Sequence, residues 1–189
     1  MRLKFIKSAV LPKDFPVGNS LEVGIIGRSN AGKSSLINLL AQQSISKVSS
    51  TPGKTRLLNF FDVDNDSFRI VDMPGYGYAA RDEDEIAQWQ KMIESYLLTR
   101  SQLRGLVLVM DSRRKWSDDE EMLKQLADHQ ELGFCIALTK TDKLNRQEII
   151  NAMKMVRIAG QTENVFAISS LKKTGHKDLE DFIYKQWVP

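Results

Sequence analysis

The residues with the clearest chemistry form a glycine-rich stretch, GRSNAGKSS, at residues 27–35. It matches the pattern G-x-x-x-x-G-K-[ST], with an apolar run before it and a helical run after it. Backbone N–H groups of such a loop point at phosphate oxygens, and the following helix adds the positive end of its dipole. Lys33 supplies a point charge, and Ser34 offers a hydroxyl to Mg²⁺. A glycine-rich turn that only caps a helix is the weaker explanation, because the pattern arises by chance in about one such chain in a hundred.

A second motif, DMPG at residues 72–75, ends an apolar run. In P-loop switch proteins an aspartate at this place holds Mg²⁺, usually through water, and the glycine N–H meets the γ-phosphate. Asp72 and Gly75 are the candidates for these two tasks. TPGKT, at residues 51–55, lies between the two motifs and can bring a threonine hydroxyl onto the same metal. We choose Thr55 because it stands next to a predicted strand.

A third motif, TKTD at residues 139–142, indicates which base is bound. The carboxylate of Asp142 can accept hydrogen bonds from N1–H and the 2-amino group of guanine, and Lys140 can lay its stem along the base. Adenine lacks this arrangement of donors and would leave the carboxylate unpaired. ISS, at residues 168–170, is placed to close over the base. An aspartate-bearing turn explains TKTD equally well in isolation, but after two phosphate motifs in chain order it predicts guanine recognition.

Hydrophobic periodicity predicts the elements that position these motifs. Apolar runs alternate with amphipathic segments of helical period, which is typical of parallel strands joined by crossover helices in an α/β protein. A polar turn at residues 64–67 predicts one antiparallel hairpin. We therefore expect a six-stranded mixed, mostly parallel sheet with helices on both faces. The predicted strands span residues 21–26, 56–63, 67–71, 103–110, 134–138 and 165–168.

Besides the helical run after the glycine-rich stretch, four helices are predicted. In the first of these, Ile86, Trp89, Ile93 and Tyr96 or Leu97 fall on one face, and in the last Leu179, Phe182, Ile183 and Trp187 do so. The other two begin with a side-chain oxygen three residues before a glutamate, at Ser117 and at Asn145, which is typical of a capping box.

Composition narrows the class of protein. The 189 residues, 42% hydrophobic and 27% charged, suffice for one good core. The net charge of +3 does not by itself predict nucleic-acid binding. The one cysteine, Cys135, lies in an apolar run, which fits a reducing compartment. Because no segment has the pattern of a signal peptide or a membrane span, we expect a cytoplasmic monomer with no membrane partner.

Taken together, the motifs resemble the EngB (YihA/YsxC) family of ribosome-assembly GTP-binding proteins, in the TrmE-Era-EngA-EngB-septin-like superfamily of Ras-like GTPases. DMPGYGYA is the most family-specific of them. The resemblance covers nearly the whole chain, except for RRKWSDDEE at residues 113–121, which does not match. The resemblance to the family rests on GRSNAGKSS, TPGKT with the arginine that follows it, DMPGYGYA, DSR at residues 111–113, TKTD, and SSLKKTG at residues 169–175.

The resemblance implies a GTP-binding switch that acts in assembly of the large ribosomal subunit, with its rRNA and proteins, and is needed for normal septation. Residues 1–20 would be an extension packed on the core, and residues 21–189 a single Ras-like P-loop domain. Mg²⁺ would be held by Ser34 and Thr55, together with Asp72 from the motif argument. The implied nucleotide contacts are Gly27, Arg28, Ser29, Asn30, Ala31, Gly32, Lys33, Ser34, Gly53, Lys54, Thr55, Arg56, Leu57, Asp72, Met73, Pro74, Gly75, Thr139, Lys140, Thr141, Asp142, Ile168, Ser169 and Ser170.

Hydrolysis of GTP usually needs a polar side chain that orients water, often a glutamine directly after DxxG. Tyr76 stands there instead, so we expect slow hydrolysis by Lys33, Thr55 and Gly75, completed by a cation or a partner. Asn30 resembles the asparagine that holds an activating K⁺ in related GTPases, and fitting a tight loop explains it equally well.

Other readings stay open at this point. Tyr76 and Tyr78 can be core aromatics or a surface for RNA or protein. The acidic residues 82–85 fit a solvated helix start better than a catalytic role. A module that binds nucleotide without hydrolysing it is a rival, whereas a phosphotransferase would need a lid that the sequence lacks. An RNA-facing patch is less favoured than scattered solubility charges; its residues would be Arg2, Lys4, Lys7, Arg113, Arg114, Lys115, Lys172, Lys173 and Lys177.

Overall fold

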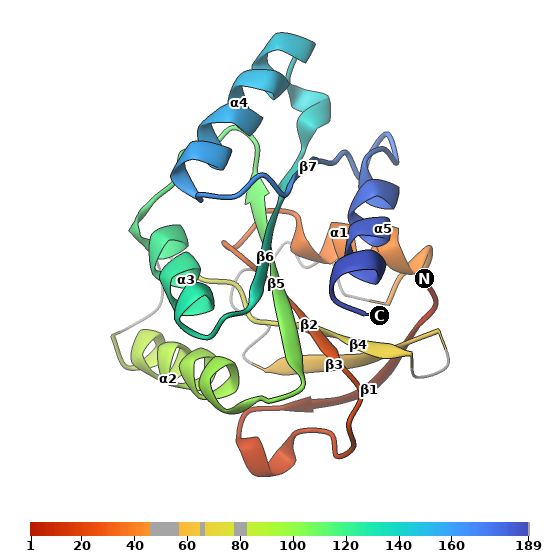
Figure 1. Cartoon of the computed structure of the whole chain (residues 1–189), viewed down its shortest axis with the longest axis vertical. Helices are drawn as coiled ribbons and strands as arrows, with labels where there is room; N and C mark the ends of the chain where they lie inside the picture. The colour runs from red at the N-terminus through yellow and green to blue at the C-terminus, as the bar shows by residue number, and fades with distance from the viewer. Residues whose placement is uncertain (46–56, 65–66, 78–82, 189) are drawn as a thin grey trace.

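Strands of the chain form one mixed sheet in the order β1-β3-β4-β2-β5-β6-β7 (Figure 1). The structure is a computed structural model and describes residues 1–45, 57–64, 67–77 and 83–188. In that part of the chain the strands are β1 (Leu3–Ala9), β2 (Glu22–Gly27), β3 (Leu58–Val63), β4 (Phe68–Asp72), β5 (Leu103–Asp111), β6 (Gly133–Thr139) and β7 (Val165–Ala167). The helices are α1 (Lys33–Ala41), α2 (Glu83–Thr99), α3 (Asp118–His129), α4 (Arg146–Ala159) and α5 (His176–Gln186), with 3-10 turns η1 (Pro12–Asp14) and η2 (Thr141–Lys143).

The α/β class and the mixed sheet are confirmed, but the described sheet has seven strands and not the predicted six. The additional strand is β1, which pairs antiparallel with β3 from Leu3 opposite Val63 to Ala9 opposite Leu58. Its register shifts between Phe5 and Lys7. Lysines and a bulge are typical of edge strands, and they hide the alternation by which a strand is recognised. Part of the predicted N-terminal extension therefore belongs to the sheet.

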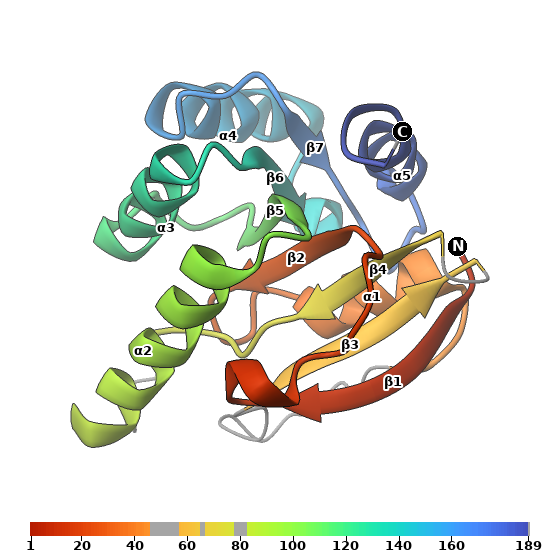
Figure 2. The same cartoon turned by 60° about the horizontal axis from the view of Figure 1, so that its bottom comes forward.

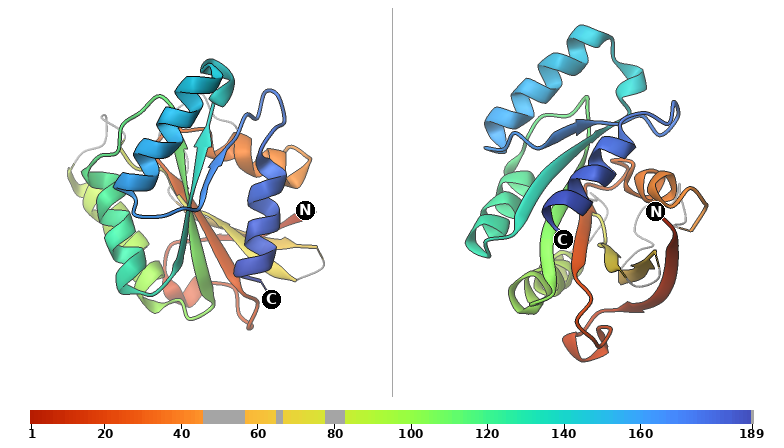
Figure 3. Two further views of the ribbon diagram at one scale, coloured as in Figure 1. Left: turned by 45° about the horizontal axis from the view of Figure 1, so that its top comes forward. Right: turned by 45° about the vertical axis from the view of Figure 1, so that its right-hand side comes forward.

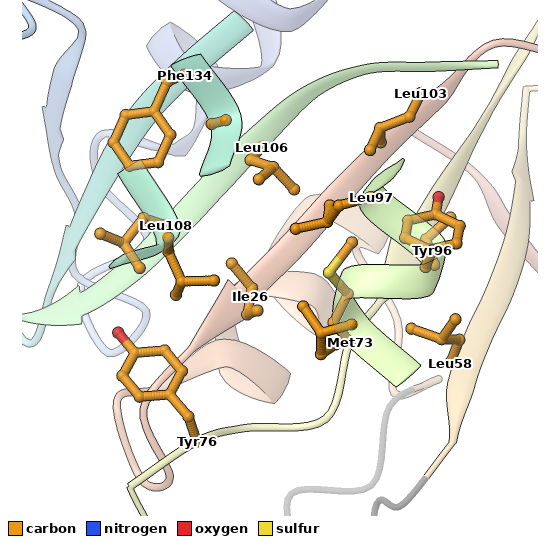
Figure 4. Close-up of a cluster of buried hydrophobic side chains, with 14 of the residues drawn as sticks. Ile26, Leu58, Met73, Tyr76, Tyr96, Leu97, Leu103, Leu106, Leu108 and Phe134 are labelled. Atoms are coloured by element: carbon orange, nitrogen blue, oxygen red, sulfur yellow. The ribbon is translucent and has the colours of Figure 1, made fainter. Parts of the chain in front are cut away.

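Helices cover both faces of the sheet (Figures 2 and 3), and each face carries a hydrophobic cluster. Helices α2, α3 and α4 cover one face, where Ile26 and Leu108 meet side chains such as Tyr96 of α2. Figure 4 shows part of this cluster. Helices α1 and α5 cover the other face, around Val107 and Ile25. Alternate residues of β2 and β5 thus point into different layers, as expected of a strand that is buried on both sides.

The predicted helices form, with one exception in the packing. Both capping boxes are present, at Ser117 with Glu120 and at Asn145 with Glu148. In α2 the residues Trp89, Ile93 and Tyr96 are buried, whereas Ile86, which was expected on the same core face, is 42% exposed. No described helix is long and apolar enough to cross a membrane.

A buried carboxylate organises the end of the sheet where β2 begins. Glu22 is fully buried, and it accepts hydrogen bonds from the Tyr96 hydroxyl at 2.8 Å and from Nε of Arg100 at 2.8 Å. Arg69 places Nη1 3.8 Å from the same carboxylate. Arg100 also donates to the carbonyl of Pro16 at 2.8 Å. These bonds tie the segment before β2 to α2 and β4.

Candidate nucleotide-binding site

The glycine-rich loop lies at the carboxyl end of β2, where Gly27 ends the strand and Lys33 begins α1. Gly32 caps the helix with a φ of +94°, a left-handed conformation that residues with a side chain rarely adopt. Asn30 also has a positive φ, of 65°. Ala31 N–H donates to the Arg28 carbonyl at 2.9 Å, which makes the loop a tight turn. The chain therefore builds the curled backbone that phosphate binding requires.

The DMPG segment lies directly against this loop. An isolated parallel bridge joins Arg28 and Tyr76. Ser29 N–H donates to the Tyr76 carbonyl at 2.9 Å, and Tyr76 N–H donates to the Gly27 carbonyl at 3.3 Å. A Cβ on Gly75 would lie 3.0 Å from the Gly27 carbonyl oxygen, so the two backbones approach too closely for a comfortable side chain. The structure thus brings the two predicted phosphate-binding segments together.

Lys33 and Asp72 meet between these segments. The Lys33 ammonium donates to Oδ1 of Asp72, and both side chains are nearly buried. Asp72 ends β4 and Lys33 begins α1, and β4 is the parallel neighbour of β2. The predicted phosphate lysine and the predicted metal-binding carboxylate therefore share one small volume.

The donor set suits magnesium. Among the described residues no group of three or more His, Cys, Asp or Glu could hold a metal ion. Mg²⁺ does not need such a cage, because it takes oxygen ligands and is commonly bound by one or two carboxylates with substrate phosphates. Asp72 and the hydroxyl of Ser34, in the first turn of α1, are ligands of that kind.

The phenol of Tyr76 points away from the phosphate loop. Its side chain is 3% exposed, and its hydroxyl donates to Oε1 of Glu120 at 2.7 Å. The ring lies 6.1 Å from that of Trp89, inside the cluster of Figure 4. Burial, and then the negative charge of Glu120, raise the pKa of Tyr76 far above its ordinary value. Of the three readings left open for Tyr76, the structure supports the core aromatic.

The predicted base-binding segments meet at the ends of β6 and β7. Thr141 N–H donates to the Ile168 carbonyl at 3.3 Å, and the Ser169 hydroxyl donates to Oδ1 of Asp142 at 2.7 Å. This hydrogen bond holds the pKa of Asp142 below its usual value, so the carboxylate is ionised at neutral pH. Lys140 reaches back to the phosphate loop and donates to the Asn30 carbonyl at 2.6 Å. TKTD is therefore hydrogen-bonded both to ISS and to the phosphate loop.

Comparisons with known proteins agree with this geometry. Residues 22–140 match a family model described as "50S ribosome-binding GTPase". A probable GTP-binding protein EngB of Bdellovibrio bacteriovorus is 55% identical over 98% of this chain and 92% of its own length. A probable GTP-binding protein EngB of Clostridium botulinum is 43% identical over all of this chain and 98% of its own. The chain belongs to the EngB family of GTPases.

Solved structures show the same fold as this EngB chain. A crystal structure of a probable GTP-binding protein EngB has a TM-score of 0.71 at 20% identity, over 87% of this chain and 97% of its own. Era in complex with MgGDPNP and a segment of 16S ribosomal RNA has a TM-score of 0.69 at 22% identity, over 90% of this chain and 57% of Era.

Several predicted contact residues of this EngB chain can reach a nucleotide only through their backbone. The side chains of Met73 and Ile168 are fully buried, and that of Ala31 nearly so, in the two hydrophobic clusters. The Pro74 carbonyl accepts a hydrogen bond at 2.9 Å from the indole Nε1 of Trp89. Ser170 is half-buried beyond β7. Backbone contacts are what a phosphate loop uses, so these positions stay compatible with the prediction.

Part of the predicted site lies outside the described residues. Gly53, Lys54, Thr55 and Arg56 are among them, and so are Tyr78 and residues 80–82. Leu57 is described and lies partly exposed directly before β3.

One functional carboxylate escaped the sequence argument, which cited Asp111 only as part of DSR. It ends β5, is 4% exposed, and pairs with Nζ of Lys140 at 3.1 Å. Arg113 binds it from the other side, with Nη2 at 2.7 Å and Nε at 2.9 Å. Burial opposes its ionisation, but the hydrogen bonds of Arg113 and Lys140 outweigh burial and hold the pKa of Asp111 well below its usual range. Asp111 therefore fixes the lysine predicted to lie along the base.

The basic residues considered for an RNA-facing patch occur in three separate segments: on β1 and directly before it, in the loop after β5, and in the loop before α5 with its first turn. Figure 1 draws β1 in the lower part of the molecule and the loop before α5 at the upper right. Scattered charges that keep the protein in solution remain the simpler interpretation of these basic residues.

Proposed function

We propose that this GTPase is a cytoplasmic switch that acts in assembly of the large ribosomal subunit and is needed for normal septation. The observation that carries the switch proposal is the bridge between Arg28 and Tyr76. It holds the γ-phosphate-sensing Gly75 beside the phosphate loop, so a change at the phosphate is felt along residues 72–77. The ribosomal part is supported by the matching family model and by the motifs that resemble those of EngB proteins.

In this proposal the phosphates lie in the curl of residues 27–34. Loop amides and the start of α1 bind phosphate oxygens, and Lys33 moves its charge from Asp72 toward them. Mg²⁺, when bound, neutralises charge on the phosphates, with Ser34, Thr55 and Asp72 as its protein ligands. Era, which shares the fold, is bound to its nucleotide analogue as MgGDPNP, and this supports the assignment. Asp142 accepts from the guanine edge, and Lys140 flanks the base.

The chain's own hydrolysis is slow, because the side chain after Gly75 does not reach the attacking water. Tyr76 donates its only phenolic proton to Glu120 in the core. A K⁺ ion at Asn30, or a surface of the ribosomal subunit, supplies the missing group. Replacing Na⁺ by K⁺ in single-turnover hydrolysis separates the two: acceleration by K⁺ alone supports the cation, and acceleration only with subunits supports the partner.

The ribosomal assignment is tested by co-sedimentation with purified large and small subunits. We expect binding to large subunits with a non-hydrolysable GTP analogue and weaker binding with GDP. Equal binding with both nucleotides contradicts the switch, and preference for small subunits contradicts the assignment. A chain that binds GTP but never turns it over, even on subunits, would be a binding module.

A further inference from the structure

A groove runs between α2 and α3, which lie next to each other on one face of the sheet (Figure 2). Its volume is about 280 Å³, below the range of pockets that enclose a whole small ligand, and most of its surface is apolar. Such a hollow has room for one or two apolar side chains of a partner. Its main lining residues are Trp89, Ile93, Glu94, Met122, Leu126 and His129.

Both helices present a large apolar side chain to solvent, Met122 in the lining of the groove and Ile86 one turn before it on α2. Met122 of α3 is 37% exposed, and Ile86 of α2 lies three residues, nearly one helical turn, before Trp89. Nothing in the core needs these two side chains at that position, since the buried face of α2 is completed by Trp89, Ile93 and Tyr96. An apolar hollow with exposed apolar side chains is typical of a protein-binding surface.

The rim of the groove is negatively charged, although the chain as a whole carries +3. Glu94 lines the groove, and Asp118 lies one helical turn before Met122 on the same side of α3. Asp119, next to it in the acidic first turn of α3, is paired with Nη1 of Arg28 at 3.4 Å, so Glu94 and Asp118 supply the negative charge of the rim. A surface of this sign repels the phosphates of RNA and attracts lysine and arginine.

The lysines of the two helices do not neutralise this rim. Helix α2 has one lysine, Lys91, two residues after Trp89 and therefore turned by roughly 200° from it around the helix. Helix α3 also has one, Lys124, whose ammonium binds Asp128 and lies 5.8 Å from the ring of Phe134 on β6. Both cations thus point away from the groove.

The walls of the groove are attached to the segment that is proposed to sense the γ-phosphate. Trp89 donates its indole N–H to the Pro74 carbonyl, one residue before Gly75. Tyr76, one residue after Gly75, packs against Trp89 and is bonded to Glu120 of α3. Both walls of the groove are therefore joined to residues on either side of Gly75.

We propose that the α2–α3 groove is a docking site for a basic amphipathic helix of a protein partner. The helix inserts an apolar side chain between Trp89 and Met122 and sets lysines and arginines against Glu94 and Asp118. Because residues 74 and 76 hold the walls, docking is tighter in one nucleotide state than in the other. Only this last clause rests on the proposed function; the docking itself does not.

A peptide experiment tests the groove without any ribosome. The probe is a dye-labelled Leu/Lys amphipathic helix of about 15 residues, the length at which an isolated helix becomes stable. A Leu/Glu peptide with the same apolar face is its control. Met122→Lys and Met155→Lys form a matched pair, because Met155 is an exposed methionine of α4 outside the groove.

We expect the Leu/Lys peptide to bind the wild type and Met155→Lys alike, and to bind Met122→Lys about tenfold more weakly, as for loss of one anchor at an interface. The Leu/Glu peptide should not bind. Binding of a GTP analogue to each variant shows that it is folded, and Gln125→Lys replaces Met122→Lys if the latter does not fold. The proposal is overturned if the wild type binds both peptides equally, or if the two methionine variants bind the Leu/Lys peptide equally.

Cross-linking then identifies the natural occupant. Cys135 is fully buried, so a cysteine introduced at Gln90 of the groove, or at Asn151 of α4 as control, is the thiol that reacts with a benzophenone maleimide. With large ribosomal subunits we expect adducts from Gln90→Cys to a Lys- and Arg-rich protein segment, more with the GTP analogue than with GDP. Adducts to RNA or to a second copy of the chain contradict the proposal. So do adducts that are no more abundant than those of Asn151→Cys. Failure to co-sediment refutes the ribosomal assignment, and the peptide result then decides the groove alone.

Discussion

Ion pairs at the two ends of the sheet differ in what else their charges can bind. At the end where β2 begins, Glu22 is surrounded by Arg100, Arg69 and Tyr96. These contacts join segments of the fold to one another. At the end where β2 stops, Lys33 pairs with Asp72 and Lys140 with Asp111, and both lysines lie where a nucleotide is expected. The first set can only hold the fold, whereas the second can exchange a carboxylate for a phosphate or a base.

The largest expected effect is on base choice. Asp142→Asn keeps one oxygen that can accept from N1–H but replaces the acceptor for the 2-amino group of guanine by an amide NH₂ donor, which suits the 2-oxo group of xanthine. We expect the preference for GTP over xanthosine triphosphate to fall by about a thousandfold, because a site built on such hydrogen bonds discriminates strongly. Competition binding with both nucleotides measures it. An unchanged preference would mean that Asp142 does not read the base.

Next in size is the stability of the opposite end. Arg100→Met leaves the carboxylate of Glu22 buried with a weakened partner set, and breaking a buried pair costs about 3 kcal/mol of unfolding free energy. Urea unfolding measures the loss, and GTP affinity should change less than twofold. Arg104→Met is the control, because Arg104 is exposed and, among the described residues, bonds only to the carbonyls of Ser101 and Leu103. A large loss of GTP affinity in Arg100→Met would erase the distinction between the two ends.

A smaller effect is expected at Asp111, because this carboxylate both stabilises the fold and holds Lys140 of the candidate site. Asp111→Asn loosens Lys140 and should weaken GTP binding about tenfold, the size of one charge-assisted hydrogen bond. Because the folded pKa of Asp111 lies below its unfolded value, its contribution to stability is present above the ordinary carboxyl pKa and is lost as the pH falls below it. The difference in unfolding free energy between wild type and variant should therefore shrink from pH 7 toward pH 3. A difference that grows on acidification would contradict this sign.

The smallest effect concerns Tyr76. Tyr76→Phe leaves Glu120 buried without one donor and should cost about 1–2 kcal/mol of stability. The single-turnover rate of GTP hydrolysis, measured well below the melting temperature, should stay within about twofold, a barrier change of under 0.5 kcal/mol. A large fall in rate with unchanged stability would return Tyr76 to the catalytic site.

Sequence reasoning can predict candidate site residues where one chemistry restricts both the residue types and their spacing. Residues 27–34 and 72–75 were recognisable because phosphate binding restricts residue type and spacing together. The orientation of Tyr76 was not, since it depends on Glu120, which lies 44 residues further along the chain. The role of Asp111 was hidden for the same reason, because its partner Lys140 is brought close only by the pairing of β5 with β6. β1 was missed because an edge strand with two lysines does not alternate. Ile86 was misplaced because helical spacing alone cannot show where the buried face of a helix ends.

The hydrogen bond from Trp89 to Pro74 also has an optical consequence. An indole responds in emission wavelength and intensity to the loss of a hydrogen-bond acceptor and to changes in neighbouring polarity. Trp89 has its acceptor in the very segment that is expected to sense the γ-phosphate, and the other two tryptophans, Trp116 and Trp187, belong to other parts of the fold. Trp89 is therefore a native fluorophore beside the proposed switch segment, and we expect its emission to report nucleotide exchange without an attached dye.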